Sequence, residues 1–326
     1  MTSEPSQIDP SDYVVENQRV ADEVRAFERR EASKRAVRSA LIFSVFLVSL
    51  GAAYVVYKAF GTSIDDAQTE WSIVGSFLPA TDDLRMPPLG AILTEFGEPV
   101  QRTSDRPLAM FILDAAWFTL RETVIGLIGG LIMGMAVAIL LLRSSWLERG
   151  FMPWVIVSQT IPLIAIAPII VIWGRTNFDF LPFEWADWMS VSVIAVYLSF
   201  FPVAVNGLRG LKSPAAADLE LMNSYAASWS ETLFKLRLPA AVPYLFPAVR
   251  LAATASVVGA IVGEISAGVP GGLGRLILDF ASRYTTGPER LYDAVIGAAL
   301  LGVAIILVLS LLERIFVSAR GQGTVS

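Results

Sequence analysis

The side chains that could do chemistry in this sequence are carboxylates, guanidinium groups, hydroxyls and amides, because the chain contains neither histidine nor cysteine. It therefore has no disulfide, no thiolate nucleophile, no Cys/His zinc ligands and no histidine acid or base. The charged residues that stand out lie inside long apolar stretches, where a charge costs ~3 kcal/mol or more at the bilayer centre. Such residues indicate positions with a binding or orienting role. As a set they form a poor catalytic cluster.

Glu264 is the first of these residues, near the end of the apolar stretch VVGAIVGEISAG. Two interpretations are open: a polar group at the outer gate of a solute pathway, or a carboxylate that reaches headgroup water. Arg250 precedes it by about four helical turns, so the two cannot form a local pair and each needs its own partner or a water-filled cavity. We expect Arg250 to extend toward the headgroups or a phosphate. Arg121 and Glu122 are expected at the outer mouth of another stretch.

An uncharged polar cluster of Ser158, Gln159 and Thr160 interrupts a further apolar stretch, which also contains Pro162 and Pro168. Prolines are tolerated in membrane helices where neighbours or waters satisfy the freed carbonyl groups. A kinked helix with this cluster at mid-depth predicts one wall of a solute pathway. The equal alternative is that these side chains bond across to adjacent helices.

Membrane helices must position these residues, since 54% of the 326 residues are hydrophobic, more than is usual for a soluble domain. A stretch of ~20 apolar residues is long enough to cross the hydrocarbon core. We predict six such helices, at residues 40–57, 123–142, 151–174, 189–208, 240–263 and 294–312. The first is expected to be an uncleaved anchor rather than a signal peptide.

Basic residues gather on one side of these helices, before residue 40 and around 209–237, whereas the loop 58–114 is mainly acidic. The positive-inside rule places both termini and the 218–239 segment in the cytoplasm. Residues 1–12 are expected to be disordered, and 14–38 to be an interfacial helix. The predicted organisation is a cytoplasmic segment at 1–37, a first transmembrane helix at 38–57, an extracytoplasmic loop at 58–116, a core with five transmembrane helices at 117–317 and a cytoplasmic tail at 318–326.

Glycines mark two further features. Gly126, Gly130 and Gly134 share one helix face, a pattern that lets two membrane helices approach closely. We expect this packing inside one chain, with a dimer contact as the weaker alternative. Residues 267–293 contain a Gly-rich turn and a short half-buried helix at 273–280, which predict an outer cap or a re-entrant helix. The chain lacks GxxxxGK[ST], so these glycines do not form a phosphate-binding loop.

The polar segment DLELMNSYAASWSETLFKLRLP at 218–239 lies between two of the predicted membrane helices. Its arrangement resembles the cytoplasmic signature of importer-type ABC permeases: Glu-Ala-Ala, three residues, Gly, nine residues, then Ile-x-Leu-Pro. Glu220 takes the Glu position, Ala226 the Gly position and Leu236 the Ile position. Leu238 and Pro239 close the motif.

The sequence departs from this motif where Leu221 and Met222 replace the two alanines. More widely, residues from about 78 to 317 resemble the permease subunits of nitrate/sulfonate/taurine-type ABC importers. The resemblance rests on TLRETVIGL, SQTIPLIAIAPIIVIWG, LRLPAAVPYLFPAVRLA, VVGAIVGE and GLGRLILD, in the family order. The pieces SYAAS and TTGPERLYDA are similar to members associated with uptake of vitamins or pyrimidine precursors.

The resemblance implies an all-α integral membrane protein with the type I ABC importer permease fold, six transmembrane helices and a cytoplasmic coupling helix near 214–237. It implies no catalytic, metal or cofactor site in this chain and no nucleic-acid partner. ATP and Mg would be bound by two copies of a cytoplasmic ATP-binding subunit. An extracytoplasmic solute-binding protein would deliver the solute, and a second permease copy would complete the pathway in the bacterial inner membrane.

The resemblance also assigns roles to residues. The positions that would couple to the ATP-binding subunit are Glu220, Tyr225, Ala226, Ala227, Leu236, Leu238 and Pro239. Leu238 and Pro239 are expected to end the coupling helix at the membrane, because proline cannot continue the helix ladder. The positions predicted to line the translocation pathway are Ser158, Gln159, Thr160 and Glu264. The alternative is a secondary transporter or channel without an ATPase, which usually has more spans or inverted repeats.

Overall fold

The computed structural model of the chain describes residues 31, 34, 37–38, 41–63, 81–100, 105–177, 182 and 184–321. The chain divides into two compact units, Met1–Pro88 and Leu89–Ser326. The predictions for residues 1–12, for most of 14–38 and for 64–80 concern residues outside the described ones.

The first unit contains the helix Leu41–Ser63, which is long and apolar enough to cross a membrane and buries none of its apolar residues within the chain. A helix that is apolar on all sides is typical of a membrane span. Its end is tied to the segment 81–88, because the Tyr54 hydroxyl donates to the Pro87 carbonyl (2.7 Å) and the Lys58 ammonium donates to Asp83 Oδ1 (2.7 Å). A helix long and apolar enough for the predicted first span is therefore present, and it extends beyond residue 57.

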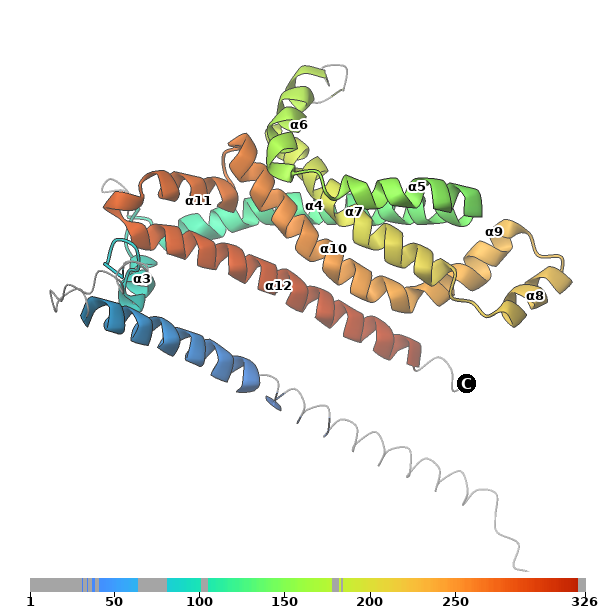
Figure 1. Cartoon of the computed structure of the whole chain (residues 1–326), viewed down its shortest axis with the longest axis horizontal. Helices are drawn as coiled ribbons and strands as arrows, with labels where there is room; N and C mark the ends of the chain where they lie inside the picture. The colour runs from blue at the N-terminus through green and yellow to red at the C-terminus, as the bar shows by residue number, and fades with distance from the viewer. Residues whose placement is uncertain are drawn as a thin grey trace, which may run out of the picture. The chain divides into compact units, whose positions relative to one another are not determined.

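The second unit is built from helices (Figure 1). They are α3 (Leu89–Glu95), α4 (Leu108–Leu142), α5 (Ser145–Ser158), α6 (Leu163–Asn177), α7 (Asp187–Leu211), α8 (Ala216–Ser224), α9 (Trp229–Thr232), the π-helix η1 (Leu233–Arg237), α10 (Leu238–Ala267), α11 (Leu273–Ser282), the 3₁₀ helix η2 (Tyr284–Thr286) and α12 (Pro288–Gly321). Within the described residues, the only β-type pairing is an isolated bridge between Pro99 and Pro107. The predicted all-α fold is confirmed.

Five helices of the described chain are long and apolar enough to span a membrane, or up to six if α5 and α6 together form one broken span. The axes of α5 and α6 are bent by 96° at the break. This agrees with the six predicted spans, although the third is broken instead of merely kinked. Helix α4 begins at Leu108, well before the predicted residue 123, so Arg121 and Glu122 lie inside a helix rather than at its mouth.

The core of the second unit lies where α4, α7 and α10 meet. Gly126 and Gly130 of α4 face Ala195 and Ser199 of α7, and a Cβ atom added at Gly130 would lie 2.0 Å from Ser199 Oγ. The Ser199 hydroxyl donates to the Gly126 carbonyl (3.0 Å), which is a cross-helix hydrogen bond that the close approach allows. The glycine face thus packs inside the chain, as predicted.

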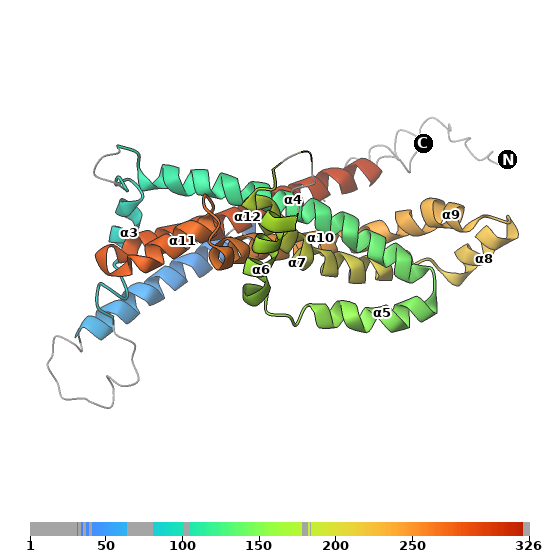
Figure 2. The ribbon, with the colours of Figure 1, turned by 90° about the horizontal axis from the view of Figure 1, so that it is seen from above.

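The chain order places two features at opposite ends of this core. Helices α8 and α9 connect the end of α7 to the start of α10, whereas α11 follows the end of α10. Figures 1 and 2 both show α8 and α9 at one end of the second unit and α11 near the other. The two groups of predicted functional residues, near 220–239 and at Glu264, are therefore separated by the length of α10.

Candidate functional site

The segment 216–232, which we call the docking segment, leaves the helix bundle between α7 and α10 (Figure 2). Neither α8 nor α9 contains a buried residue. Large side chains face outward, with Tyr225 79% and Leu221 55% exposed. An exposed edge with aromatic and apolar side chains next to charged ones is typical of a protein-binding surface.

A tight turn joins the two helices of the docking segment. Ala226 adopts the left-handed conformation with φ 51°. Around it the Ala226 amide donates to the Asn223 carbonyl (2.9 Å) and the Ala227 amide donates to the Met222 carbonyl (3.0 Å). This is how many helices end, and glycine usually occupies the left-handed position because it has no Cβ atom. The backbone thus explains why the permease signature carries Gly where this chain has Ala226.

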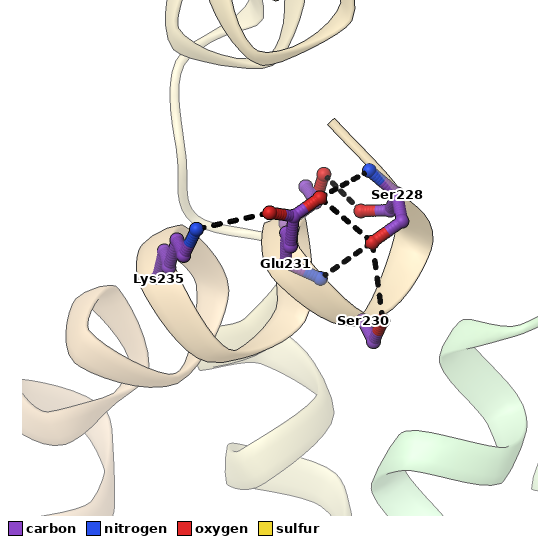
Figure 3. Close-up of polar contacts among 5 residues, drawn as sticks. Ser228, Ser230, Glu231 and Lys235 are labelled. Atoms are coloured by element: carbon purple, nitrogen blue, oxygen red, sulfur yellow. Dashed lines mark hydrogen bonds and ion pairs between the residues drawn. The ribbon is translucent and has the colours of Figure 1, made fainter. Parts of the chain in front are cut away.

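A capping box fixes the start of α9 (Figure 3). The Glu231 amide donates to Ser228 Oγ (3.3 Å), and the Ser228 amide donates to Glu231 Oε2 (2.9 Å). Lys235 extends the network one turn further, with its ammonium 3.0 Å from Glu231 Oε1. Reciprocal bonds of this kind satisfy two amide groups that a helix start leaves free. The Arg143 guanidinium at the end of α4 stacks over the Trp229 ring at 4.6 Å.

The predicted coupling residues fall into an outer and an inner group. Glu220, Tyr225 and Ala226 are exposed, and Ala227 is half-buried in the turn. Glu220 forms no hydrogen bond or ion pair within the described part of the chain. Leu238 instead packs against a cluster at the base of the bundle that includes Leu141 and Leu211, and Leu236 is half-buried.

Leu238 and Pro239 do not end the helix, contrary to expectation. The chain runs from α9 through η1 into α10 without a loop, and the Leu238 amide donates to the Leu233 carbonyl in the wider π pattern. The π-helix places one extra residue in the turn that precedes Pro239, which accommodates the ring and the missing amide of proline. The predicted helical segment is interrupted earlier, at the turn around Ala226.

Ser158, Gln159 and Thr160 lie at the break between α5 and α6. The Ser158 hydroxyl donates to Val155 O (2.7 Å) and the Thr160 hydroxyl to Val157 O (2.8 Å), so both bond within their own turn. The Tyr197 hydroxyl of α7 donates to the Ser158 carbonyl. Gln159 Nε2 is buried and has no partner among the described residues. The break therefore presents one free amide donor and backbone groups that a regular helix would have bonded.

Glu264 is 0% exposed and lies under the Gly-rich turn that leads to α11. Thr119 of α4 donates its hydroxyl to Glu264 Oε1 (2.7 Å), and the Gly274 amide donates to Glu264 Oε2 (2.6 Å). A Cβ atom at Gly272 would lie 2.0 Å from Glu264 Oε1, so the turn approaches the carboxyl closely because it lacks side chains. The carboxyl is enclosed within the chain, away from headgroup water; its predicted role in the pathway stays a prediction.

Glu122 was missed as a companion of Glu264. It is also 0% exposed, and it lies one turn after Thr119, the residue of α4 that donates to Glu264 Oε1. Since its partner is on another helix, no local pattern identifies the pair. The signal that was available is a carboxylate immediately before the uncharged run 123–142, inside a helix that continues in both directions. Arg250 finds its partner on α12, where Glu313 accepts from its guanidinium.

Comparisons with known proteins agree with this arrangement. Residues 126–321 match the family of inner membrane components of binding-protein-dependent transport systems. The chain is 34% identical over 165 residues to the formylaminopyrimidine transport permease protein ThiX of Halalkalibacterium halodurans, covering 51% of this chain and 62% of that protein. It is 29% identical to the riboflavin transport system permease protein RibX of Chloroflexus aurantiacus, covering 53% of this chain and 59% of that one.

A putative aliphatic sulfonates transport permease, SsuC of Bacillus subtilis, is 26% identical, with 58% of this chain and 64% of that protein covered. The chain thus spans less than two thirds of the length of these relatives. Among solved structures, a chain of the MetNI methionine ABC transporter in an inward-facing conformation has a TM-score of 0.50 at 20% identity, covering 61% of this chain and 96% of that chain. At this identity the likeness shows the fold, which is that of ABC importer permeases.

Proposed function

The chain belongs to the family of inner membrane components of binding-protein-dependent transport systems, and we propose that it is the permease subunit of an ATP-driven importer. In this role it forms the pathway for a small solute and catalyses no reaction itself. The observation that carries the proposal is the docking segment, which holds the exposed part of the permease signature at one end of the bundle without burying any of its residues.

The proposed partners follow from this surface and from the family. Two copies of a cytoplasmic ATP-binding subunit, which bind ATP and Mg, contact the docking segments of two permease copies. An extracytoplasmic binding protein delivers the solute to the other side. ATP binding would favour one packing of the helix bundle through its contacts with the docking segment, and ligands shift such equilibria only by binding the two states differently. Both termini of the permease are proposed to be cytoplasmic, in the bacterial inner membrane.

The pathway is proposed to pass the break between α5 and α6, where Gln159 presents a free amide. Every side chain of the cluster at Ser158, Gln159 and Thr160 is uncharged. On the same helix pair, Arg175 is already held by Asp187 through two bonds of 2.6 and 2.5 Å. An uncharged polar site favours a neutral heterocycle over a sulfonate anion, because a buried anion needs a cationic or multiple-donor partner. Glu264 would reach the solute only if the turn above it moved.

The experiment that tests the function uses the permease co-expressed with a candidate ATP-binding subunit, chosen from the neighbouring genes by the motif GxxxxGK[ST]. Tyr225→Ala should abolish co-purification or reduce stimulated ATP hydrolysis at least about tenfold, since large aromatic side chains at the centre of an interface often contribute 2 kcal/mol or more. Because Tyr225 is 79% exposed, the variant should remain folded in the membrane.

The matched control is Trp117→Ala, which removes a side chain that is 72% exposed near the start of α4, far along the chain from the docking segment. It should leave assembly and hydrolysis unchanged. Normal assembly and hydrolysis in Tyr225→Ala would remove this edge from the interface, and a chain that moves solute without any ATP-binding subunit would favour the secondary transporter. With the binding protein added, riboflavin or a formylaminopyrimidine should stimulate hydrolysis, whereas an alkanesulfonate should not.

A further inference from the structure

Two carboxyl groups from different membrane helices meet in the interior of the second unit. Glu122 of α4 and Glu264 of α10 are both 0% exposed, and Thr119, one turn before Glu122 on α4, donates to Glu264 Oε1. The nearest basic side chain in sequence is Arg121, whose guanidinium stacks over the rings of Phe118 (4.7 Å) and Trp188 (4.2 Å). On the adjoining α11, Arg275 pairs with Asp279. Neither cation forms a salt bridge with the two carboxyl groups among the described residues.

The surroundings of Glu264 are those of an ionised carboxylate. Its two oxygens accept hydrogen bonds from Thr119 Oγ1 (2.7 Å) and from the Gly274 amide (2.6 Å). Gly274 is in the first turn of α11, where free amide groups and the helix dipole both favour a negative charge. Thr119 is itself fixed, because its Oγ1 accepts from the Leu273 amide (2.9 Å). Donors therefore converge on Glu264 from α4 and from α11.

The surroundings of Glu122 are the opposite. Both of its carboxyl oxygens are buried, and neither accepts a hydrogen bond from any donor in the described part of the chain. An ionised carboxylate in such a place would lose its hydration without compensation and would face a second negative charge. Two carboxyl groups that share one buried site resolve this repulsion by holding a proton between them.

We propose that Glu122 and Glu264 form a proton-binding site in which Glu122 keeps its proton and donates a hydrogen bond to the Glu264 carboxylate. The shared proton joins α4 to α10, and through Glu264 it holds the Gly-rich turn at the start of α11. Glu122 is thus a positioning residue that acts through Glu264. This site follows from the packing of a single chain and does not depend on whether the chain transports a solute.

In this proposal Glu122 is the hydrogen-bond donor and Glu264 the acceptor. Replacing each in turn by glutamine, in the full chain purified into lipid nanodiscs, tests this difference. Glu122→Gln keeps a donor toward Glu264, whereas Glu264→Gln places an amide N–H2 against donors that need an acceptor. We expect the unfolding midpoint of Glu122→Gln to stay within about 1 °C of the wild type, and that of Glu264→Gln to fall by about 3 °C or more.

A spectroscopic readout separates a shared proton from a merely structural role. The infrared spectrum of the wild type should contain a carbonyl band of a protonated carboxylic acid that is absent in Glu122→Gln. Glu313→Gln is the matched control, since that carboxylate is ion-paired with Arg250 and partly exposed, and the band should persist in it. Asp293 is a second buried carboxyl without a described donor, so Asp293→Asn identifies its own band separately.

Under the proposal, the acid band of Glu122 disappears in Glu122→Gln and persists in the control Glu313→Gln. The loss of stability is confined to Glu264→Gln. The proposal is overturned if Glu264→Gln is as stable as the wild type, if Glu122→Gln fails to fold, or if no acid band disappears in Glu122→Gln.

Discussion

Among the described residues other than glycine, only Ala226 adopts a positive φ, at 51°. A residue with a Cβ atom in this conformation costs about 1–2 kcal/mol, because Cβ crowds the following carbonyl oxygen. The turn keeps Ala226 there because the amides of Ala226 and Ala227 are bonded to the end of α8. The docking segment therefore has a strained corner at the position where the family signature carries glycine.

Replacing Ala226 by glycine should remove this strain. We expect Ala226→Gly to stabilise the docking segment by about 1 kcal/mol, since glycine adopts the left-handed conformation without steric cost. Hydrogen–deuterium exchange of a peptide covering 216–232 measures the effect as slower exchange. Ala217→Gly in α8 is the control with the opposite sign, because glycine within a helix costs up to about 1 kcal/mol relative to alanine. Faster exchange in Ala226→Gly would contradict the strain argument.

Single residues differ in how far their role could be predicted from sequence. Glu264 was identifiable because a carboxylate in an apolar stretch is costly and needs a reason. Its bonds to Thr119 and to the Gly274 amide were not, since they join parts of the chain that only the fold brings together. The same holds for Arg250, whose partner Glu313 lies on α12. Charge and spacing thus locate such residues but do not name their partners.

At the scale of elements, the contact between α4 and α7 depends on glycines rather than on large apolar side chains. Gly126, Gly130 and Gly134 leave room for the backbone and small side chains of α7. Lipid is as apolar as a leucine side chain, so close packing and cross-helix hydrogen bonds must supply the attraction between membrane helices. Ser199 and Ser256 supply such bonds to the carbonyls of Gly126 and Thr123.

A pair of glycine substitutions tests this packing. Gly130→Ala should lower stability by about 1–3 kcal/mol, because the new methyl group would overlap Ser199 and the core would have to shift. Gly302→Ala in α12 is the matched control, since nothing lies within 4 Å of the added Cβ. There we expect a gain of up to about 1 kcal/mol from helix propensity. Thermal unfolding in nanodiscs measures both, and equal effects of the two variants would show that the α4–α7 contact tolerates a methyl group.

The elements themselves were largely predictable, because the length and apolarity of a stretch are sufficient to identify a membrane helix. All of the predicted stretches correspond to helices of the structure. The 96° bend between α5 and α6 was not predicted, although Pro162 and the polar cluster mark its position. A sequence pattern shows where a helix ladder is weak, but the direction of the bend depends on neighbouring helices. The π-helix before Pro239 likewise lies where a continuing helix has to accommodate a proline ring and its missing amide.

At the scale of the whole molecule, the positive-inside rule predicts which side of the membrane each end of the second unit faces. The structure provides exposed serines toward the two ends of the second unit, Ser224 as the last residue of α8 and Ser282 as the last residue of α11. The chain is naturally free of cysteine. In intact cells a membrane-impermeant maleimide should label Ser282→Cys and leave Ser224→Cys unlabelled. Permeabilised cells, in which both should react, provide the control, and the reverse pattern in intact cells would invert the topology.

The uninterrupted run from α9 through η1 to α10 has a mechanical consequence. It extends over 39 residues, Trp229–Ala267, or about 58 Å at the rise of an α-helix. Pro239, Pro243 and Pro247 all lie in its first half and remove ladder hydrogen bonds there, so bending is easiest in the half next to the docking segment. The helix should therefore bend easily near the docking segment, so that a sideways movement of a bound partner is not passed on. A rotation of the docking segment about the helix axis would instead be transmitted along the helix to the turn that covers Glu264.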